Sequence, residues 1–321
     1  MSWLPVGRTV LDRYVLVKPL ARGGISLVYE AIDVSRMRPA AVKVLAPTFA
    51  RNTRACQAAR QEPLVMQQLR HPSVPRVYAF GDVAQLDGGG LPAVAMELIC
   101  GVPLAQRLAR GALPWQQAVE IAAMIAEMLA VAHRRGIVHR DLTPDNVMLT
   151  PRGVKVIDFG LAAMSIQDRV AVRVEQDRVA VRMERDRVTV RVEQDRVAVR
   201  VKSDIPSRPE FSQDVYALGV LLYQMLTGRS PYPVPLLHMD RWPTASRISR
   251  PAPTPVLAGI GVPRDIADLC RSCMAKRPGD RPDSARAALE LWSTLIAIDP
   301  DAAERAVAGD GVPRAATVAC Y

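Results

Sequence analysis

The chain has 321 residues, 49% of them hydrophobic, and a formal net charge of +10. This length and apolar content allow one large or two small domains with a full core. The positive charge would suit an anionic partner, but the sequence has no lysine- and arginine-rich run and no basic stretch interleaved with aromatic residues. We therefore expect no nucleic-acid partner. No apolar run reaches the roughly 18 residues that a membrane helix needs, so we also expect no membrane span.

The cysteines and the N-terminus favour a cytoplasmic protein. Five scattered cysteines do not fit a disulfide framework, which favours a reducing compartment. Residues 1–10 lack the basic region followed by an apolar core that marks a secretory signal. Cys270 and Cys273 form a C-x-x-C pair within a predicted helix, where two half-buried thiols are a more ordinary interpretation than a redox or metal site.

The N-terminal third is predicted to consist mainly of strands. Residues 13–45 alternate apolar and polar side chains and are interrupted by a glycine turn at Gly23 and Gly24. A helix is predicted between about residues 51 and 69, and further strands over 74–98.

From Gly101 onward the pattern becomes helical. Residues 115–135 place apolar side chains on one face of a helix. Further helices are predicted over 214–227, 264–276 and 284–298. The sequence therefore predicts an α+β protein with a small β-rich lobe followed by a larger helical lobe.

Residues 167–202 are an internal repeat of four nine-residue copies, QDRVAVRVE, QDRVAVRME, RDRVTVRVE and QDRVAVRVK. Apolar residues alternate within a copy, as in a strand, but the odd period would turn a continuous strand over at every copy. No Gly, Pro or Asn is present to form tight hairpin turns. We expect a solvated or loosely ordered insert; the alternative is an ordered β element that binds a partner or covers a substrate site.

The strongest chemical signal is a cluster of carboxylate and amide side chains. Residues 139–146 read HRDLTPDN, and the tripeptide DFG follows at 158–160. Phosphoryl transfer from ATP needs a carboxylate that orients a hydroxyl and accepts its proton, together with metal ions that neutralise the phosphates. Asp141 suits the first role, while Asn146 and Asp158 supply hard oxygen ligands suited to Mg²⁺.

These two motifs, in this order and at this spacing, resemble those of protein kinases, and the chain is most similar to the bacterial, eukaryotic-like Ser/Thr kinases. The resemblance implies a two-lobed protein kinase fold, with ATP and Mg²⁺ as cofactors and a protein as substrate. It implies a kinase domain over 13–295, with an N-lobe at about 13–97 and a C-lobe at about 101–295. Within it the repeat would be an insert in the activation segment, followed by a loose tail over 296–321.

The same resemblance assigns residues to the site. Lys43, in an A-A-V-K sequence, would grip the phosphates of ATP, Glu62 would hold Lys43, and Asp141 would act on the acceptor hydroxyl. Asn146 and Asp158 would bind the metal. The nucleotide-binding residues that it implies are Leu20, Ala21, Gly23, Gly24, Val28, Ala41, Lys43, Met96, Glu97, Ile99 and Met148.

Four positions depart from the family pattern. The glycine loop keeps only its middle glycine, because Ala21 and Ser26 replace the outer two. Thr143 stands where Ser/Thr kinases have a lysine, which removes a positive charge near the γ-phosphate. Pro63 directly follows Glu62, and proline kinks a helix interior. Either the helix begins near Glu62, or the pair between Glu62 and its lysine is imperfect.

The segment before Asp214 departs furthest. Arg208-Pro209-Glu210 resembles the Ala-Pro-Glu that ends the activation segment, but it lies only four residues before Asp214. By the resemblance, Asp214 would bind the backbone of the catalytic loop. Arg281 would pair with Glu210, or with nothing.

Two functions remain open from the sequence. The first is an active Ser/Thr protein kinase, because every ionisable group for ATP and Mg²⁺ is present. The second is a silent, nucleotide-binding interaction protein, which Thr143 and the reduced glycine loop would favour. No sensor domain accompanies the predicted kinase, so we expect any input to come through a separate regulatory protein.

Overall fold

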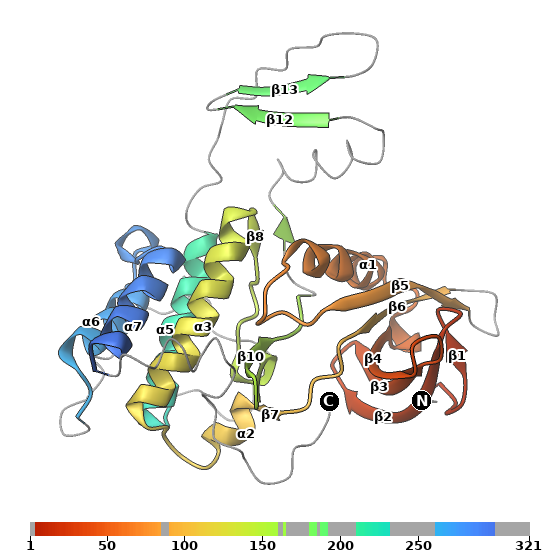
Figure 1. The fold of residues 1–321 in the computed structure, drawn as a ribbon, viewed down its shortest axis with the longest axis horizontal. Helices are drawn as coiled ribbons and strands as arrows, with labels where there is room; N and C mark the ends of the chain where they lie inside the picture. Colours follow the sequence, from red (N-terminus) through yellow and green to blue (C-terminus); the bar gives the residue numbers. More distant parts are fainter. Residues whose placement is uncertain are drawn as a thin grey trace.

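The computed structural model describes residues 4–84, 90–159, 163–164, 180–184, 187–191, 210–231 and 261–298. These residues form two lobes that lie side by side in Figure 1, a sheet-rich N-lobe and a helical C-lobe. The α+β architecture predicted from the sequence is confirmed. The residues expected to form a loose C-terminal tail lie outside the described residues from residue 299 on.

The N-lobe is built on one antiparallel sheet with the strand order β1-β2-β3-β4-β6-β5. Its strands follow the alternating pattern of the sequence, since Leu27, Tyr29 and Ala31 of β3 are buried while Ile32 is exposed. The strands are β1 (Thr9–Val10), β2 (Tyr14–Arg22), β3 (Ser26–Asp33), β4 (Arg38–Leu45), β5 (Val77–Ala84) and β6 (Gly90–Met96).

Helix α1 (Thr53–Gln68), which packs against β4, β5 and β6, continues through Pro63. Its start is fixed by the Asn52 side chain, which accepts a hydrogen bond from the Ala55 N–H at 3.0 Å. A proline inside a helix removes one backbone hydrogen bond and costs about 3 kcal/mol. Val65 and Met66, in the turn after the proline, are buried in the core and stabilise the helix there. The helix predicted between about residues 51 and 69 is therefore confirmed, and the alternative start near Glu62 is wrong.

The C-lobe places its longest helix, α3 (Trp115–Arg134), at the centre, where it packs against α5 and α7. Its other helices are α2 (Leu104–Leu108), α5 (Phe211–Thr227), α6 (Arg264–Cys273) and α7 (Ser284–Ile298). Its short strands are β7 (Val102–Pro103), β8 (Ile137–Val138), β9 (Val147–Thr150), β10 (Gly153–Val156) and β11 (Ala163–Met164). Short 3-10 helices are η1 (Pro47–Phe49) in the N-lobe and η2 (Pro144–Asn146) and η4 (Pro278–Asp280) in the C-lobe.

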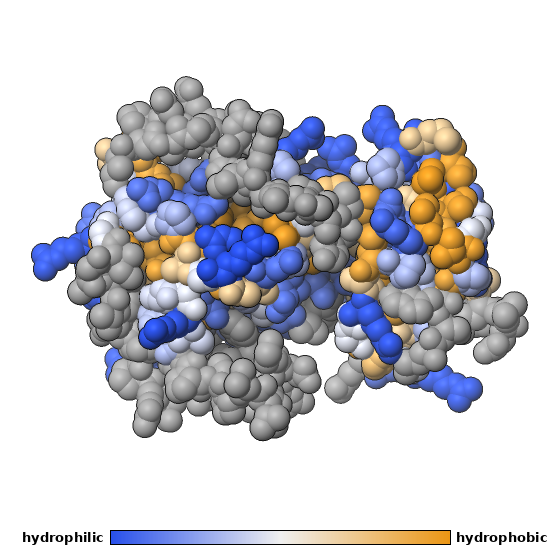
Figure 2. All heavy atoms as spheres, turned by 90° about the horizontal axis from the view of Figure 1, so that it is seen from below, coloured by the Kyte–Doolittle hydropathy of each residue, from blue (hydrophilic) through white to orange (hydrophobic). Residues whose placement is uncertain are grey.

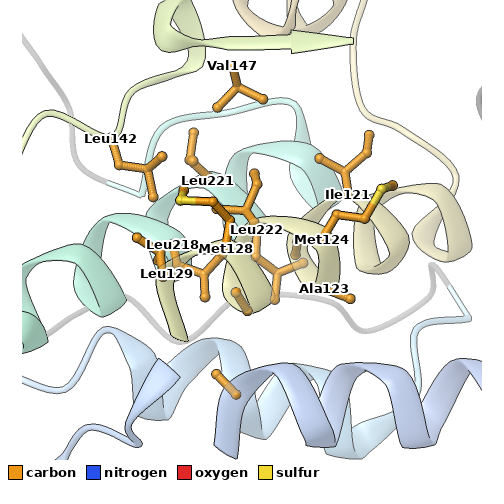
Figure 3. Packing of buried hydrophobic residues seen from close by; sticks show 14 of the residues in the cluster. Ile121, Ala123, Met124, Met128, Leu129, Leu142, Val147, Leu218, Leu221 and Leu222 are labelled. Carbon is orange, nitrogen blue, oxygen red and sulfur yellow. The ribbon is translucent and has the colours of Figure 1, made fainter. Parts of the chain in front are cut away.

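The core of the C-lobe forms where α3 meets α5, and it supports the loop that follows α3. Figure 3 shows Met128 and Leu129 of α3 beside Leu218 and Leu221 of α5. Leu142, which follows the HRD motif, lies over the same cluster and is 1% exposed. The predicted catalytic loop is therefore anchored directly on this core.

The two thiols of the C-x-x-C pair belong to this core. Cys270 and Cys273 are free and buried on α6. Burial raises the pKa of both thiols, that of Cys273 to about 12, so neither is a reactive thiolate near neutral pH. Cys56 is also free, but Cys100 is disulfide-bonded. The expectation of unpaired cysteines is thus wrong at Cys100.

Two copies of the repeat pair as an antiparallel hairpin. Strand β12 (Ala180–Glu184) pairs with β13 (Arg187–Arg191), with Val181 opposite Val190 and Glu184 opposite Arg187. The absence of Gly, Pro and Asn had led us to expect a solvated or loosely ordered insert, and this pairing differs from that expectation. A nine-residue period gives each copy room for a five-residue strand and a polar connector, so consecutive copies can fold back on each other. The rest of the repeat lies outside the described residues.

Exposed apolar side chains gather on the N-lobe. Figure 2 shows apolar surface over this lobe, where Ile32, Val34, Met37, Tyr78 and Phe80 are among the exposed large apolar side chains. No helix in the described part of the chain is both long enough and apolar enough to span a membrane.

Candidate active site

Lys43 lies at the centre of a charge cluster between β4 and α1. It alternates with the buried Val42 and Val44, so its side chain points away from the apolar side of the sheet. The Lys43 Nζ donates to both carboxylate oxygens of Glu62, at 2.8 Å each, and to Oδ1 of Asp158 at 3.1 Å. Residues that are far apart in the sequence therefore meet here, and the expected imperfect pairing at Glu62 does not occur.

Opposing effects set the charge of this lysine. Burial disfavours the ammonium, but the carboxylates of Glu62 and Asp158 outweigh it and raise the pKa of Lys43. The Glu62 carboxylate is only 5% exposed, whereas that of Asp158 is 46% exposed. Lys43 is thus a fixed positive charge, with one buried partner that holds it and one accessible partner.

Strand register brings the predicted nucleotide-binding residues of the N-lobe together. Val28 of β3 is opposite both Ala21 of β2 and Lys43 of β4. Ala41 of β4 is opposite Met96 of β6. These pairings place the residues on adjoining strands beside the Lys43 ammonium.

The glycine turn joins β2 to β3 tightly. The Gly23 N–H donates to the Ser26 carbonyl at 2.9 Å. A Cβ atom at Gly23 would lie 3.1 Å from Ser26 Oγ, whereas one at Gly24 would meet nothing within 4 Å. Of these two glycines, Gly23 is therefore the one at which an added Cβ atom would be crowded. Leu20 is half-buried near the end of β2.

The segment after β6, residues 96–99, connects the lobes, and we call it the hinge. The Glu97 N–H donates to the Arg76 carbonyl at 2.8 Å, so it is already engaged. Within the described residues, Leu98 and Ile99 are the hinge positions whose N–H groups remain for a ligand. Ile99 is buried, and Met148 is buried on β9 of the C-lobe.

The loop after β8 holds Asp141 and Asn146 together. The side-chain amide of Asn146 donates to the Asp141 carbonyl at 2.8 Å and to its Oδ2 at 3.0 Å. The amide oxygen of Asn146 is thereby turned away from the carboxylate, where it can serve as a ligand. Thr143 is half-buried in the same loop, just before η2.

The buried carboxylate of Asp214 holds this loop in place. Asp214 of α5 accepts hydrogen bonds from the backbone N–H of His139 at 2.8 Å and of Arg140 at 2.9 Å. Arg140 has a left-handed backbone, with φ of 66°, which is strained for a residue with a side chain. The carboxylate stabilises that conformation. His139 is fully buried and its ring meets that of Phe159 edge-on at 4.6 Å.

A further residue, His133, holds Asp214, and the sequence motifs do not point to it. His133 Nε2 lies 3.0 Å from Asp214 Oδ2, and His133 Nδ1 lies 3.0 Å from Ser284 Oγ at the start of α7. The sequence signal was weak, because a single histidine in the last turn of a helix has many ordinary interpretations.

Arg281 does not pair with Glu210, which was one of the two outcomes expected for it. Arg281 is buried, and its guanidinium donates to the Ala275 and Ser212 carbonyls at 2.8 Å each. Glu210 instead lies 3.5 Å from Arg140, in an exposed pair. Because Glu210 directly precedes α5, it lies beside the catalytic loop that Asp214 anchors.

The residues fit a divalent cation with few protein ligands. Asn146 offers an amide oxygen and Asp158 an accessible carboxylate, both of which are hard ligands. The described residues contain no group of three or more His, Cys, Asp and Glu that could hold a metal by themselves. This donor set suits Mg²⁺, which usually keeps waters and substrate phosphates among its ligands.

Comparisons with known proteins identify the family of this chain. The family model described as protein kinase domain matches residues 14–293. The chain is 31% identical over 304 residues to a Corynebacterium efficiens protein named serine/threonine-protein kinases drp72, covering 90% of this chain and 55% of that protein. It is 32% identical over 297 residues to serine/threonine-protein kinase PknB of Mycobacterium leprae, covering 89% of this chain and 43% of that protein. The chain thus spans about half the length of the curated relatives it matches.

A solved structure shows the same fold. The PknI kinase domain of Mycobacterium tuberculosis superposes with a TM-score of 0.59 at 23% identity, and the alignment covers 91% of this chain and 99% of that one. At this identity the likeness concerns the fold alone.

Proposed function

Because the chain belongs to the protein kinase domain family, we propose that it is a Ser/Thr protein kinase that transfers the γ-phosphate of ATP to a protein hydroxyl. The observation that carries this proposal is the cluster in which Lys43 binds both Glu62 and Asp158. It presents a fixed cation beside an accessible carboxylate. Phosphoryl transfer relies mainly on positioning and electrostatics, and this cluster supplies both.

Each side chain has a specific task in this proposal. Lys43 neutralises phosphate charge while Glu62 prevents it from swinging away. Asp141 orients the acceptor hydroxyl and accepts its proton, and Asn146 keeps its carboxylate in place. When bound, Mg²⁺ would supply charge neutralisation for the phosphates, and Asn146 and Asp158 are the residues that would hold it.

The nucleotide is proposed to lie under the glycine turn and against the hinge. Val28, Ala41 and Met148 are apolar residues suited to contact a purine base. Leu20, Ala21 and Gly24 border the turn whose Gly23 allows close backbone approach. The N–H of Ile99 is available for the base.

The kinase domain would extend over 13–295, with the repeat at 167–202 as an insert in its activation segment. The need for ATP supports a cytoplasmic location, whereas the disulfide at Cys100 contradicts the argument from the cysteines. Regulation would come from a separate protein.

A transfer assay tests the proposal. The purified chain is incubated with radiolabelled ATP, Mg²⁺ and a mixture of Ser- and Thr-containing proteins. Asp141→Asn should lower transfer by about 100-fold or more, because it removes the proton acceptor. Asp145→Asn is the matched control, because Asp145 is exposed in the same loop. Nucleotide binding without any transfer would instead support the silent interaction protein.

A further inference from the structure

A cavity, which we call the rear cavity, opens beside the hinge. Its volume is about 870 Å³, within the range of small-molecule sites. It is formed by the end of α1, the segment that connects α1 to β5, the hinge and β10. Leu69 and Val74, both buried, contribute to an apolar part of its wall. Of the residues proposed for ATP, only Glu97 lines it.

The charged side chains of this cavity are mostly basic. Arg70, Arg76 and Lys155 line it, against the single carboxylate of Glu97. Lys155 Nζ lies 2.7 Å from Glu97 Oε2, and the same oxygen accepts a hydrogen bond from the Arg76 N–H at 3.1 Å. The carboxylate can neutralise only one of the cations. The guanidinium groups of Arg70 and Arg76, both exposed residues, leave a positive wall.

His71 adds a neutral donor. The Ser73 N–H donates to His71 Nδ1 at 3.0 Å, so the neutral ring carries its proton on Nε2. Burial, together with the charges of Lys155 and Arg135, lowers the pKa of His71. The ring therefore stays neutral near pH 7 and offers an N–H group within a field that favours anions.

We propose that this cavity binds a phosphomonoester that has a small apolar body. The dianionic head would take the donors of Arg76, Lys155 and His71, since charge-assisted bonds to phosphate are the strongest polar contacts available here. The cavity is far larger than one phosphate group, and its apolar wall would contact the rest of the ligand. Glu97 would be the unfavourable group, because its carboxylate competes with the ligand for Lys155.

The site lies next to the hinge without overlapping the phosphate-binding cluster at Lys43. A ligand that draws Lys155 away from Glu97 would change the contacts of a hinge residue. Such a ligand would therefore change the affinity of the chain for the nucleotide that we propose binds at the hinge.

Calorimetric titration of the full chain with phenyl phosphate, in the absence of Mg²⁺, tests the proposal. Phenyl phosphate should bind saturably and more tightly than inorganic phosphate, and phenol should not bind. Lys155→Met and Arg76→Met should each weaken binding by roughly fivefold or more, because each removes one charge-assisted contact. Arg110→Met is the control, because Arg110 is an exposed arginine after α2 that does not line the cavity.

Glu97→Gln gives a sharper test, because this substitution should strengthen phenyl phosphate binding, whereas Lys155→Met and Arg76→Met should weaken it. Removing the competing carboxylate should tighten phenyl phosphate binding by about threefold. No saturable binding to the wild-type chain would overturn the proposal. So would equal affinity in wild type, Lys155→Met and Arg76→Met, or weaker binding in Glu97→Gln. The readout requires no kinase activity, so its failure and that of the proposed function can be told apart.

Discussion

Replacing Asp214 with asparagine tests whether one buried carboxylate holds the catalytic loop in place. The carboxylate is 1% exposed and binds the N–H groups of His139 and Arg140 as well as the ring of His133. Asparagine keeps the size of the side chain but has a single acceptor oxygen. Its NH₂ group must face one of the N–H groups that the replaced carboxylate oxygen had bound, so that N–H group loses its acceptor.

The loss of stability in Asp214→Asn follows from the three hydrogen bonds of this carboxylate. If the amide oxygen takes the place of Oδ2, the bonds to His139 and His133 persist as neutral ones and the bond to Arg140 is lost. Loss of charge weakens each surviving bond by about 1 kcal/mol, and the part-buried N–H of Arg140, left without its acceptor, costs about 2 kcal/mol. The total is about 4 kcal/mol, which corresponds to a fall in Tm of about 8–16 °C for a domain of comparable size.

Thermal unfolding followed by circular dichroism measures this loss, and hydrogen exchange of residues 137–142 locates it. Those amides should exchange faster in the variant, because Arg140 no longer has support for its left-handed backbone. Asp268→Asn is the control, since that carboxylate is 62% exposed and pairs with Arg271 of its own helix. A Tm for Asp214→Asn within about 2 °C of wild type, with unchanged exchange, would refute the reasoning.

Three further predictions concern separate parts of the molecule. Glu127 is an exposed residue of α3, but partial desolvation of its carboxyl group raises its pKa. The folded state therefore holds this proton more tightly than the unfolded state, and stability should fall modestly as pH rises through the raised pKa; Glu127→Gln should lack this fall in pH-dependent denaturation curves. A Cβ atom at Gly219 would lie 2.7 Å from Cys273 Cβ, so Gly219→Ala should lower the free energy of unfolding by about 1–3 kcal/mol, whereas Gly24→Ala, which has open space, should not. Thr143→Lys should raise kcat for phosphoryl transfer more than it lowers KM for ATP, because the added charge acts on the transition state; an unchanged kcat in a folded variant would contradict this.

Much of this protein follows from local sequence pattern. The alternation in residues 13–45 predicts the N-lobe strands, and the spacing of apolar residues over 115–135 predicts α3, because both depend on periods of 2 and 3.6 residues that the chain displays directly. The HRD and DFG motifs likewise indicate their chemistry, since phosphoryl transfer needs those groups in a narrow arrangement.

Only the tertiary structure decided how distant groups meet. Pro63 looked incompatible with a long helix, yet packing of the next turn keeps α1 intact and brings Glu62 to Lys43. Arg281 binds backbone carbonyls and Glu210 lies by Arg140, because chain geometry rather than motif identity sets their neighbours. The rear cavity joins α1, the hinge and β10, elements whose proximity no local period encodes. Local periodicity depends on residues that are close together in the sequence, whereas such contacts depend on how whole elements pack against one another.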